Sequence, residues 1–339
     1  VIDKSVQEQE VKPPPPFTTD ALLAEAARVL KLSPMTVMAI AQELFEMGLI
    51  TYHRTDSTTV SYVGRSVARD YISDRFGEAY FVPREWKMPG AHECIRPTRP
   101  IDARRLRNLV SAKILRFPRK LTPEHYRVYD LIFRRFMASQ MAPAKLERLT
   151  LRLRLKCKGR VVKVLTREGE VADYVERSYV CKIAEEGFLK VLKERVRRIE
   201  NLEEFLEGFK VERILKRRKI PKVGPPTFES VVNTMKEREI GRPSTYSKII
   251  DVLLERGYVV QRKTYLLARN EGERVYEFLQ KKYGDLVSEE VTRELLRQMD
   301  EIAQGKRSAI GVIEDLLKEL YEKIPEMKER FPEILNKLS

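Results

Sequence analysis

The chain has 339 residues, and its 65 Lys and Arg against 50 Asp and Glu give a formal net charge of +15 at pH 7. This length predicts two or three domains, the hydrophobic content of 42% excludes a wholly disordered chain, and no run of about 18 apolar residues is present that would span a bilayer. The positive charge favours a polyanionic partner such as nucleic acid, with a basic surface that serves only solubility as the alternative.

A stiff proline segment, Pro13 to Pro16, predicts a connector, and compact structure is expected to begin after it. Thr18 to Asp20 can cap a first helix. Ser33 and Pro34 can start a second helix, which Gly48 ends. The apolar faces expected to be buried are Leu22, Ala26, Val29 and Leu30 on the first helix and Val37, Ile40, Ala41 and Leu44 on the second.

A short strand is predicted over 49–53, and the turn-forming residues Thr55 to Ser57 are expected to start another helix near Val60. Tyr52 therefore lies at a strand end. Because side chains alternate along an extended segment, Tyr52 and Arg54 are expected to point to the same side.

A separate β domain is predicted from about Leu149, where leucines alternate with polar residues as in a sheet with one wet face. The alternating residues are Leu149, Leu151, Leu153 and Leu155 with Thr150, Arg152, Arg154 and Lys156. Later strands are expected over 159–166 and 179–183. The domain is expected to end near a second proline-rich joint, Pro221 to Pro226.

Helices are predicted again after that joint, first over 227–237 and then from a cap at Ser244 to Gly257. Two short strands, 258–261 and 264–267, follow. This order of helix, turn, helix and hairpin is like that of a winged helix. The remainder is expected to be mostly amphipathic helix.

The chemistry of Tyr52 depends on its neighbours. A tyrosine with a pKa near 10 is a poor nucleophile and needs a proton acceptor and a cation that stabilises the phosphate. The Arg54 guanidinium matches two phosphate oxygens. A Tyr beside Ile50 on a strand is more often a packed sheet aromatic, so the local pattern alone favours packing over catalysis.

The run from Gly48 to Thr58, GLITYHRTDST, resembles the active-site signature of type IA DNA topoisomerases. The His that follows the Tyr is most similar to reverse gyrase within that family. Further blocks resemble the family in family order, so that the resemblance covers nearly the whole chain. These blocks are Pro14 to Thr19, Ala41 to Glu46, Gly90 to Pro100, Phe136 to Met141, Glu239 to Tyr246 and Arg297 to Lys306.

The resemblance implies roles for individual residues. Tyr52 is the expected nucleophile, with Arg54 on the phosphate and His92 as a phosphate-contacting or proton-relaying group. Arg96 and Thr98 either contact DNA phosphate or brace their loop.

Cys94 stands where the family usually has Ala, and we expect it to pack rather than react. The family's DNA-binding block places Arg242 opposite phosphate, with Ser244 and Thr245 at a helix N-terminus that can bind an anion. A plain capped turn is the alternative there.

The fold implied by the resemblance is multi-domain α+β, with helical winged-helix-like domains and a β arch that form part of a type IA topoisomerase toroid. Residues 1–15 and 147–225 are the expected β arch. Residues 16–146 are the expected helical domain that carries Tyr52, and 226–339 the expected helical DNA-binding base.

Type IA enzymes also carry a Toprim domain whose acidic residues supply general acid/base chemistry and bind magnesium, and the chain shows no counterpart of it. Helicase motifs and a phosphate-binding loop are also not found. We therefore expect no metal site and no cofactor in this chain, Mg²⁺ from the missing Toprim domain, and ATP only through a helicase portion. A start at Val1 fits a split subunit or a truncated chain.

The expected function is type IA topoisomerase activity: single-strand cleavage through a 5′-phosphotyrosine link, strand passage and religation. With a Toprim/helicase-bearing partner, ATP drives positive supercoiling. The alternatives are a non-enzymatic winged-helix DNA-binding protein and a tyrosine recombinase, which attaches DNA through a 3′-phosphate and uses a wider Arg and His set.

The three cysteines, Cys94, Cys157 and Cys181, form no CxxC pair, which predicts neither a zinc finger nor a disulfide framework. This use of cysteine predicts an intracellular, cytoplasmic protein. Because no apolar run is long enough to span a bilayer, we also expect no membrane partner. The 34% of charged residues with few amides resembles proteins from thermophiles.

Overall fold

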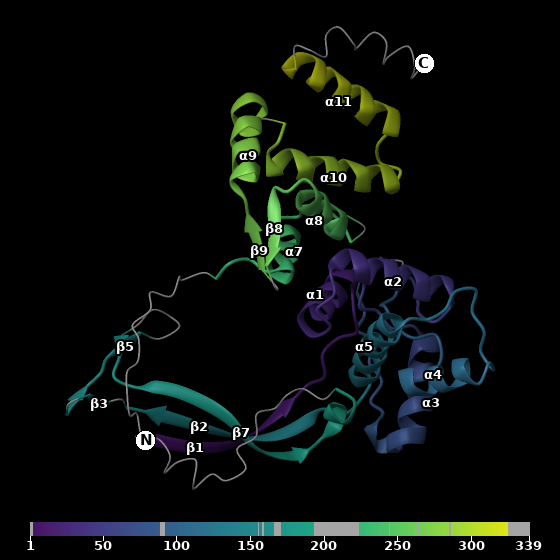
Figure 1. The fold of residues 1–339 in the computed structure, drawn as a ribbon, viewed down its shortest axis with the longest axis vertical. Coiled ribbons are helices and arrows are strands. Elements are labelled where there is room, and N and C mark those ends of the chain that lie inside the picture. The colour runs from purple at the N-terminus through teal and green to yellow at the C-terminus, as the bar shows by residue number, and fades with distance from the viewer. Residues whose placement is uncertain are drawn as a thin grey trace. The chain divides into compact units, whose positions relative to one another are not determined.

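The computed structural model describes residues 3–88, 92–154, 156–157, 159–165, 171–192, 224–243, 245–262, 265–284 and 286–324. Its contacts divide the chain into two compact units, Val1–Leu22 with Thr36–Val223 and Leu23–Met35 with Gly224–Ser339. Helices and strands occur in both units, so the fold is α+β (Figure 1).

A three-stranded antiparallel sheet joins the start of the chain to its middle. It consists of β1 (Asp3–Val11), β2 (Ala144–Leu153) and β7 (Val175–Glu185), in the order β1-β2-β7 (Figure 1). The register pairs Asp3 with Arg152 and Val11 with Ala144. Regular structure therefore begins before the proline segment, not only after it, because β1 finds its hydrogen-bonding partner far along the chain.

The leucine alternation predicted for β2 is confirmed over the part that lies in the strand. Leu149 and Leu151 are fully buried, whereas Arg152 is exposed. Register shifts against β7 at Lys145/Leu146 and at Glu147/Arg148 change which positions face inward, so that Leu146, three residues before Leu149, is also buried. Such shifts are β-bulges or irregularities, which an alternation pattern does not reveal.

Four two-residue strands extend this part of the unit as two small hairpins, β3 (Lys156–Cys157) with β4 (Arg160–Val161), and β5 (Val164–Leu165) with β6 (Val171–Ala172). The single strand predicted over 159–166 is therefore wrong, because its two halves pair with different partners. The strand predicted over 179–183 is confirmed as part of β7. Leu155 and Thr166 lie outside the described residues.

The first helices follow the predicted boundaries closely. They are α1 (Thr19–Val29) and α2 (Pro34–Glu46). The predicted apolar face of α2 is buried throughout. On α1 the buried side chains are Leu22, Leu23 and Ala26, whereas Val29 is 47% exposed, so the predicted face is rotated by one position.

Three further helices and two short 3-10 helices lie in the described part of the first unit, which also contains α2, whereas α1 from Leu23 onward belongs to the second unit. They are α3 (Tyr62–Phe76), α4 (Ala103–Ser111), α5 (Pro123–Ser139), η1 (Glu78–Tyr80) and η2 (Gly187–Lys190). Helix α5 supplies much of the core through Tyr129, Phe133 and Phe136, each at most 1% exposed. Aromatic side chains bury large apolar areas, so this helix stabilises the unit that carries Tyr52.

The C-terminal unit contains α7 (Phe228–Glu237), α8 (Tyr246–Glu255), the hairpin β8 (Val259–Arg262) with β9 (Tyr265–Ala268), α9 (Asn270–Tyr283), α10 (Glu289–Ala303) and α11 (Ala309–Lys323). The predicted order of two helices and a hairpin is confirmed, with both strands shifted by one residue. The hydroxyl of Thr227 accepts from Ser230 N at the start of α7. Buried side chains of Phe228, Val232, Ile250 and Leu266 form the core here.

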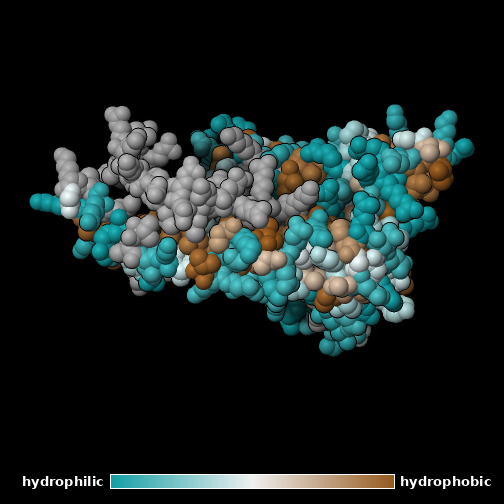
Figure 2. All heavy atoms as spheres, turned by 90° about the horizontal axis from the view of Figure 1, so that it is seen from below, coloured by the Kyte–Doolittle hydropathy of each residue, from teal (hydrophilic) through white to brown (hydrophobic). Residues whose placement is uncertain are grey.

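The surface of the described residues is mostly hydrophilic. On the face drawn in Figure 2, apolar side chains lie in small separate groups among hydrophilic ones. Within the described ranges, no helix has both the length and the apolar character needed to cross a membrane.

Candidate functional site

The segment around Tyr52 is not a strand, and the chain bends at Thr51 and His53. Ile50 forms an isolated bridge to Pro97, and the other hydrogen bonds come from Thr19 and from the loop at 94–98. The Thr19 hydroxyl donates to the His53 carbonyl at 2.8 Å and accepts from Thr55 N at 2.8 Å, and Thr19 N donates to the Thr55 carbonyl. The predicted strand over 49–53 is therefore wrong: only a single bridge forms at Ile50, because Thr19 and not a second strand bonds to the backbone after Tyr52.

The predicted alternation of side chains along this segment is nevertheless present. His53, Thr55 and Ser57 are buried, whereas Tyr52 and Arg54 are exposed. The chain bends at His53, between the two exposed residues. That Tyr52 and Arg54 point to one side therefore stays a prediction.

Gly48 turns the chain from α2 into this segment. Its φ of +66° is in the left-handed region that glycine adopts without strain, and Leu49 N donates to the Leu44 carbonyl at 2.9 Å. This is the helix end predicted at Gly48. The next helix, α3, begins at Tyr62, close to the start predicted near Val60, but its N-cap is Ser61 and not one of the residues Thr55 to Ser57. The hydroxyls of Thr55 and Ser57 instead accept from backbone N–H groups two residues on.

The Tyr52 ring lies in a cluster of aromatic side chains. Its centroid is 5.4 Å from that of Phe45, 5.6 Å from that of His53 and 5.9 Å from that of His92. Tyr52 is 40% exposed, and no residue that the structure describes hydrogen bonds to its hydroxyl. The ring is thus fixed by its neighbours while the hydroxyl faces outward, an arrangement suited to reaction with a bound molecule.

His92 lies beside Tyr52, as predicted from the resemblance of the 90–100 block to the family motif. The two rings are inclined at 46°, and His92 is exposed. Phe45 is a contact that the sequence reasoning missed, because nothing in the pattern of α2 shows that this partly exposed side chain touches a residue beyond the turn at Gly48.

His53 is fully buried, which the sequence reasoning also missed. Neither ring nitrogen finds a hydrogen-bond partner in the described part of the chain. Burial and, to a smaller extent, the positive charge of Arg54 together lower the pKa of His53 to about 4, against the opposing effect of Glu46. The imidazole of His53, next to the Tyr52 ring, is therefore neutral at pH 7.

Arg96 is 5% exposed, and its guanidinium is engaged within the protein. Its Nε and Nη2 donate to the two carboxylate oxygens of Glu93, each at 2.9 Å, and its Nη1 donates to the Pro97 carbonyl at 3.0 Å. The Thr98 hydroxyl donates to the Gly48 carbonyl at 2.6 Å. Of the two alternatives for these residues, the geometry favours bracing of the loop over contact with DNA phosphate.

Cys94 lies in the same loop and is fully buried. Burial raises the pKa of its thiol to about 12, and the nearby Glu93 carboxylate acts in the same direction. A thiol in this setting stays protonated and packs as a small apolar group, as the sequence predicted.

The second group of predicted site residues lies before α8. The Arg242 guanidinium pairs with Asp300 at 2.7 Å, and Arg242 is 38% exposed. The Thr245 hydroxyl accepts from Arg242 N at 2.8 Å, and Thr245 is the N-cap residue of α8. Ser244 lies outside the described residues. A phosphate bound by Arg242 competes with Asp300 for the guanidinium.

Comparisons with known proteins agree with this arrangement. A family model described as DNA topoisomerase matches residues 1–314. Reverse gyrase from Pyrococcus furiosus is 44% identical over 326 residues, which make up 96% of this chain and 25% of that protein. Reverse gyrase 1 from Aquifex aeolicus is 45% identical over 326 residues, or 95% of this chain and 26% of that protein.

The fold is also similar to a solved structure, full-length topoisomerase I from Thermotoga maritima. The TM-score is 0.69 and the identity 30%, and the match covers 96% of this chain and 51% of that one. The chain belongs to the type IA DNA topoisomerase family, which confirms the resemblance found in the motifs. It spans about a quarter of the length of the two reverse gyrases.

The family implies magnesium. Over the described ranges, no group of three or more His, Cys, Asp or Glu lies close enough together to hold a metal ion. Glu93, the carboxylate nearest in sequence to His92, is paired with Arg96. The described residues therefore do not fit a magnesium site.

Proposed function

We propose that this chain is the tyrosine-bearing part of a type IA topoisomerase of the reverse gyrase kind, and that Tyr52 is its nucleophile. The observation that carries this proposal is the exposed Tyr52 side chain, held by ring contacts with Phe45, His53 and His92 inside a match to the DNA topoisomerase family.

The proposed chemistry is an exchange of esters. The Tyr52 oxygen attacks a backbone phosphorus, a 5′-phosphotyrosyl bond forms, and the bond to the 3′-oxygen of the neighbouring nucleotide breaks. The 3′-hydroxyl later attacks the phosphotyrosine and reseals the strand. One phosphodiester replaces another, so religation needs no nucleotide. Arg54 stabilises charge on the phosphate oxygens, and His92 contacts the phosphate or relays the tyrosine proton.

The DNA-binding surface is proposed to include Arg242, Ser244 and Thr245. The arrangement of α7, α8 and the hairpin β8-β9 supports a winged-helix module there. For Arg96 and Thr98 we propose a positioning role, since their donors are engaged within the loop.

The domain division proposed is the one given by the sequence. Residues 1–15 and 147–225 form a β arch, 16–146 the helical domain that carries Tyr52, and 226–339 the DNA-binding base of a toroid. Pairing of β1 with β2, and of β2 with β7, supports the assignment of both ends of the first domain to one sheet.

The partner proposed is a Toprim- and helicase-bearing portion, on another chain or on a longer form of this one, and the substrate is DNA with single-stranded segments. That portion supplies magnesium and the acid/base carboxylates. ATP bound by the helicase portion drives positive supercoiling. The assembly is proposed to act in the cytoplasm.

The test uses DNA labelled at one end or the other, incubated with the chain, a Toprim-bearing portion and Mg²⁺, and stopped with denaturant. We expect label to become protein-linked through a 5′-phosphate, and plasmid to relax only when the Toprim-bearing portion is present. The chain alone is expected to bind single-stranded DNA without relaxing plasmid.

Each alternative gives a different result. A 3′-linked adduct identifies a recombinase, and salt-sensitive binding without any adduct identifies a non-enzymatic DNA-binding protein. Efficient relaxation of plasmid by the chain alone also refutes the proposal that a Toprim-bearing portion is required.

A further inference from the structure

We infer that Thr51 and the ion pair Glu93–Arg96 are positioning residues that fix His92 against the ring of Tyr52. The inference rests on the proposed function of Tyr52 and His92, and it adds Thr51 and Glu93, which the motifs did not single out, to the positioning role proposed for Arg96. Its basis is that two segments far apart in sequence, 49–60 and 92–98, are joined by polar contacts before and after Tyr52 and directly after His92.

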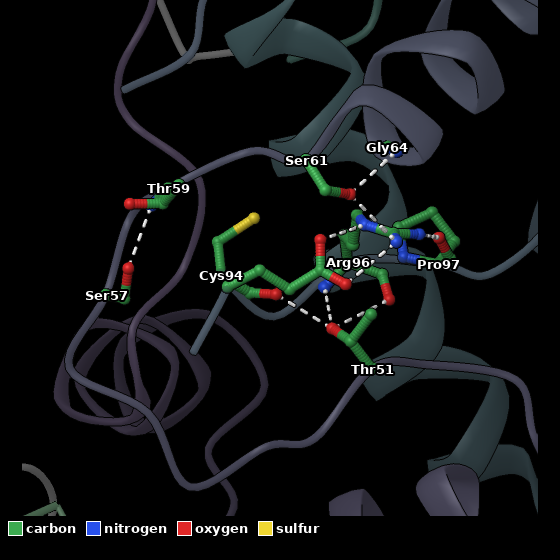
Figure 3. Close-up of polar contacts among 9 residues, drawn as sticks. Thr51, Ser57, Thr59, Ser61, Gly64, Cys94, Arg96 and Pro97 are labelled. Atoms are coloured by element: carbon green, nitrogen blue, oxygen red, sulfur yellow. Dashed lines mark hydrogen bonds and ion pairs between the residues drawn. The ribbon is translucent and has the colours of Figure 1, made fainter. Parts of the chain in front are cut away.

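Thr51 makes the first of two sets of contacts between these segments. Its hydroxyl donates to the Cys94 carbonyl at 2.8 Å and accepts from Arg96 N at 3.0 Å (Figure 3). Its backbone N donates to the Arg96 carbonyl at 2.9 Å. The residue that precedes Tyr52 thus holds the backbone on both sides of Ile95, close to His92.

The Glu93–Arg96 ion pair makes the second set of contacts. The carboxylate of the residue after His92 receives two parallel hydrogen bonds from a guanidinium that is almost fully buried. Such a bidentate pair fixes orientation as well as distance. Arg96 Nη2 also donates to the Ser61 hydroxyl at 3.4 Å, the same hydroxyl that accepts from Gly64 N and caps α3. The pair therefore ties the His92 segment to the start of α3.

Gly64 provides the space for this pair. A Cβ at position 64 would lie 2.8 Å from Arg96 Nε and 2.9 Å from Arg96 Cδ, closer than side-chain atoms approach. Figure 3 shows Arg96 between Pro97 and the start of α3, where Ser61 and Gly64 lie. Because Arg96 is held by Glu93, a side chain at position 64 would displace a guanidinium that is already hydrogen bonded.

Cys94 N closes the arrangement by donating to the Thr59 carbonyl at 2.9 Å. The segment that follows His92 is therefore hydrogen bonded both to Thr51, which precedes Tyr52, and to Thr59, which follows Tyr52. A displacement of about 1 Å at a reacting group can slow a reaction about 100-fold, so a connection of this kind affects rate more than DNA affinity.

The first experiment follows the His92 ring directly in the full chain. Only three His are present, so their imidazole NMR signals can be assigned with single variants. The centroid of the His92 ring is 5.9 Å from that of Tyr52, and the ring current of Tyr52 makes the His92 signal sensitive to their separation. We expect Thr51→Val and Glu93→Asp to move the His92 signal while the His125 signal stays in place, and Thr51→Ser, which keeps the hydroxyl, to restore it.

The second experiment measures single-turnover DNA cleavage with the Toprim-bearing portion and Mg²⁺. Thr51→Val and Glu93→Asp are expected to slow cleavage by about tenfold or more while the dissociation constant for DNA changes by less than about twofold. Gly64→Ala is expected to act in the same direction. Glu85→Gln is the matched control, since Glu85 pairs with Arg65 of α3 at 2.7 Å without touching the 92–98 segment.

The outcomes are separable. An unmoved His92 signal and an unchanged cleavage rate in folded Thr51→Val and Glu93→Asp overturn the inference. An equal loss in Glu85→Gln also overturns it, because it shows a general effect of stability. A wild-type assembly that forms no 5′-linked adduct overturns the proposed function alone, since the NMR measurement involves no DNA.

Discussion

Tyr52→Phe is expected to reduce covalent capture of DNA to less than about one thousandth of the wild-type level, with DNA binding nearly intact. Only the hydroxyl is lost. The contacts of the ring with Phe45, His53 and His92 are made by carbon atoms that phenylalanine retains. The measurement is the amount of denaturant-trapped adduct formed with the Toprim-bearing portion and Mg²⁺, alongside a binding curve for single-stranded DNA.

Tyr62→Phe is the matched control for this variant. Tyr62 is 79% exposed at the start of α3, ten positions along the chain from Tyr52, and the same atom is removed. Adduct formation is expected to be unchanged in the control. Undiminished adduct in Tyr52→Phe is incompatible with the assignment of the nucleophile.

The buried His53 predicts a second large effect, on stability rather than on chemistry. The folded pKa of about 4 lies below the ordinary value of 6.5. Below pH 6.5 the unfolded chain therefore binds the proton more readily than the folded chain. The free energy of unfolding is expected to fall by about 3 kcal/mol between pH 6.5 and pH 4 from this residue alone.

Urea unfolding of wild type and of His53→Phe across this range tests the prediction. The variant is expected to lose this part of the pH dependence and to gain stability at pH 7, because two buried nitrogen atoms without partners are removed. His92→Gln is the control, since His92 is exposed. Identical pH profiles for wild type and His53→Phe exclude the proposed burial of a neutral imidazole.

The elements predicted well from sequence are those whose signals are local. The stripe of α2 from Val37 to Leu44, its proline start and its end at Gly48 all depend on residues within one or two turns. The alternation of Leu149 and Leu151 is equally local. Here burial and backbone preference act in the same direction, so the pattern and the structure agree.

The errors come from contacts that join distant segments. The Tyr52 segment has strand-like composition, but Thr19 and the loop at 94–97 supply its hydrogen bonds, so no ladder forms. Helix α3 begins near the predicted Val60, but Ser61 caps it, because Thr55 and Ser57 use their capping chemistry for turns instead.

The same limit applies to the candidate site. The proximity of His92 to Tyr52 came from resemblance of motifs, since periodicity does not relate residues forty positions apart. The role of Arg96 depended on whether its guanidinium found an internal partner. Glu93 is three positions away, but the space for the pair comes from the absence of a side chain at Gly64, which no local pattern shows.

The pairing of Val11 with Ala144 has a topological consequence. The polypeptide leaves the sheet and returns to it at adjacent points, so everything between these two residues forms a cassette with neighbouring ends. The aromatic cluster around Tyr52 and its connections to the loop at 94–98 all lie within this stretch. The candidate nucleophile and its supports are therefore built from one insertion between two paired strands.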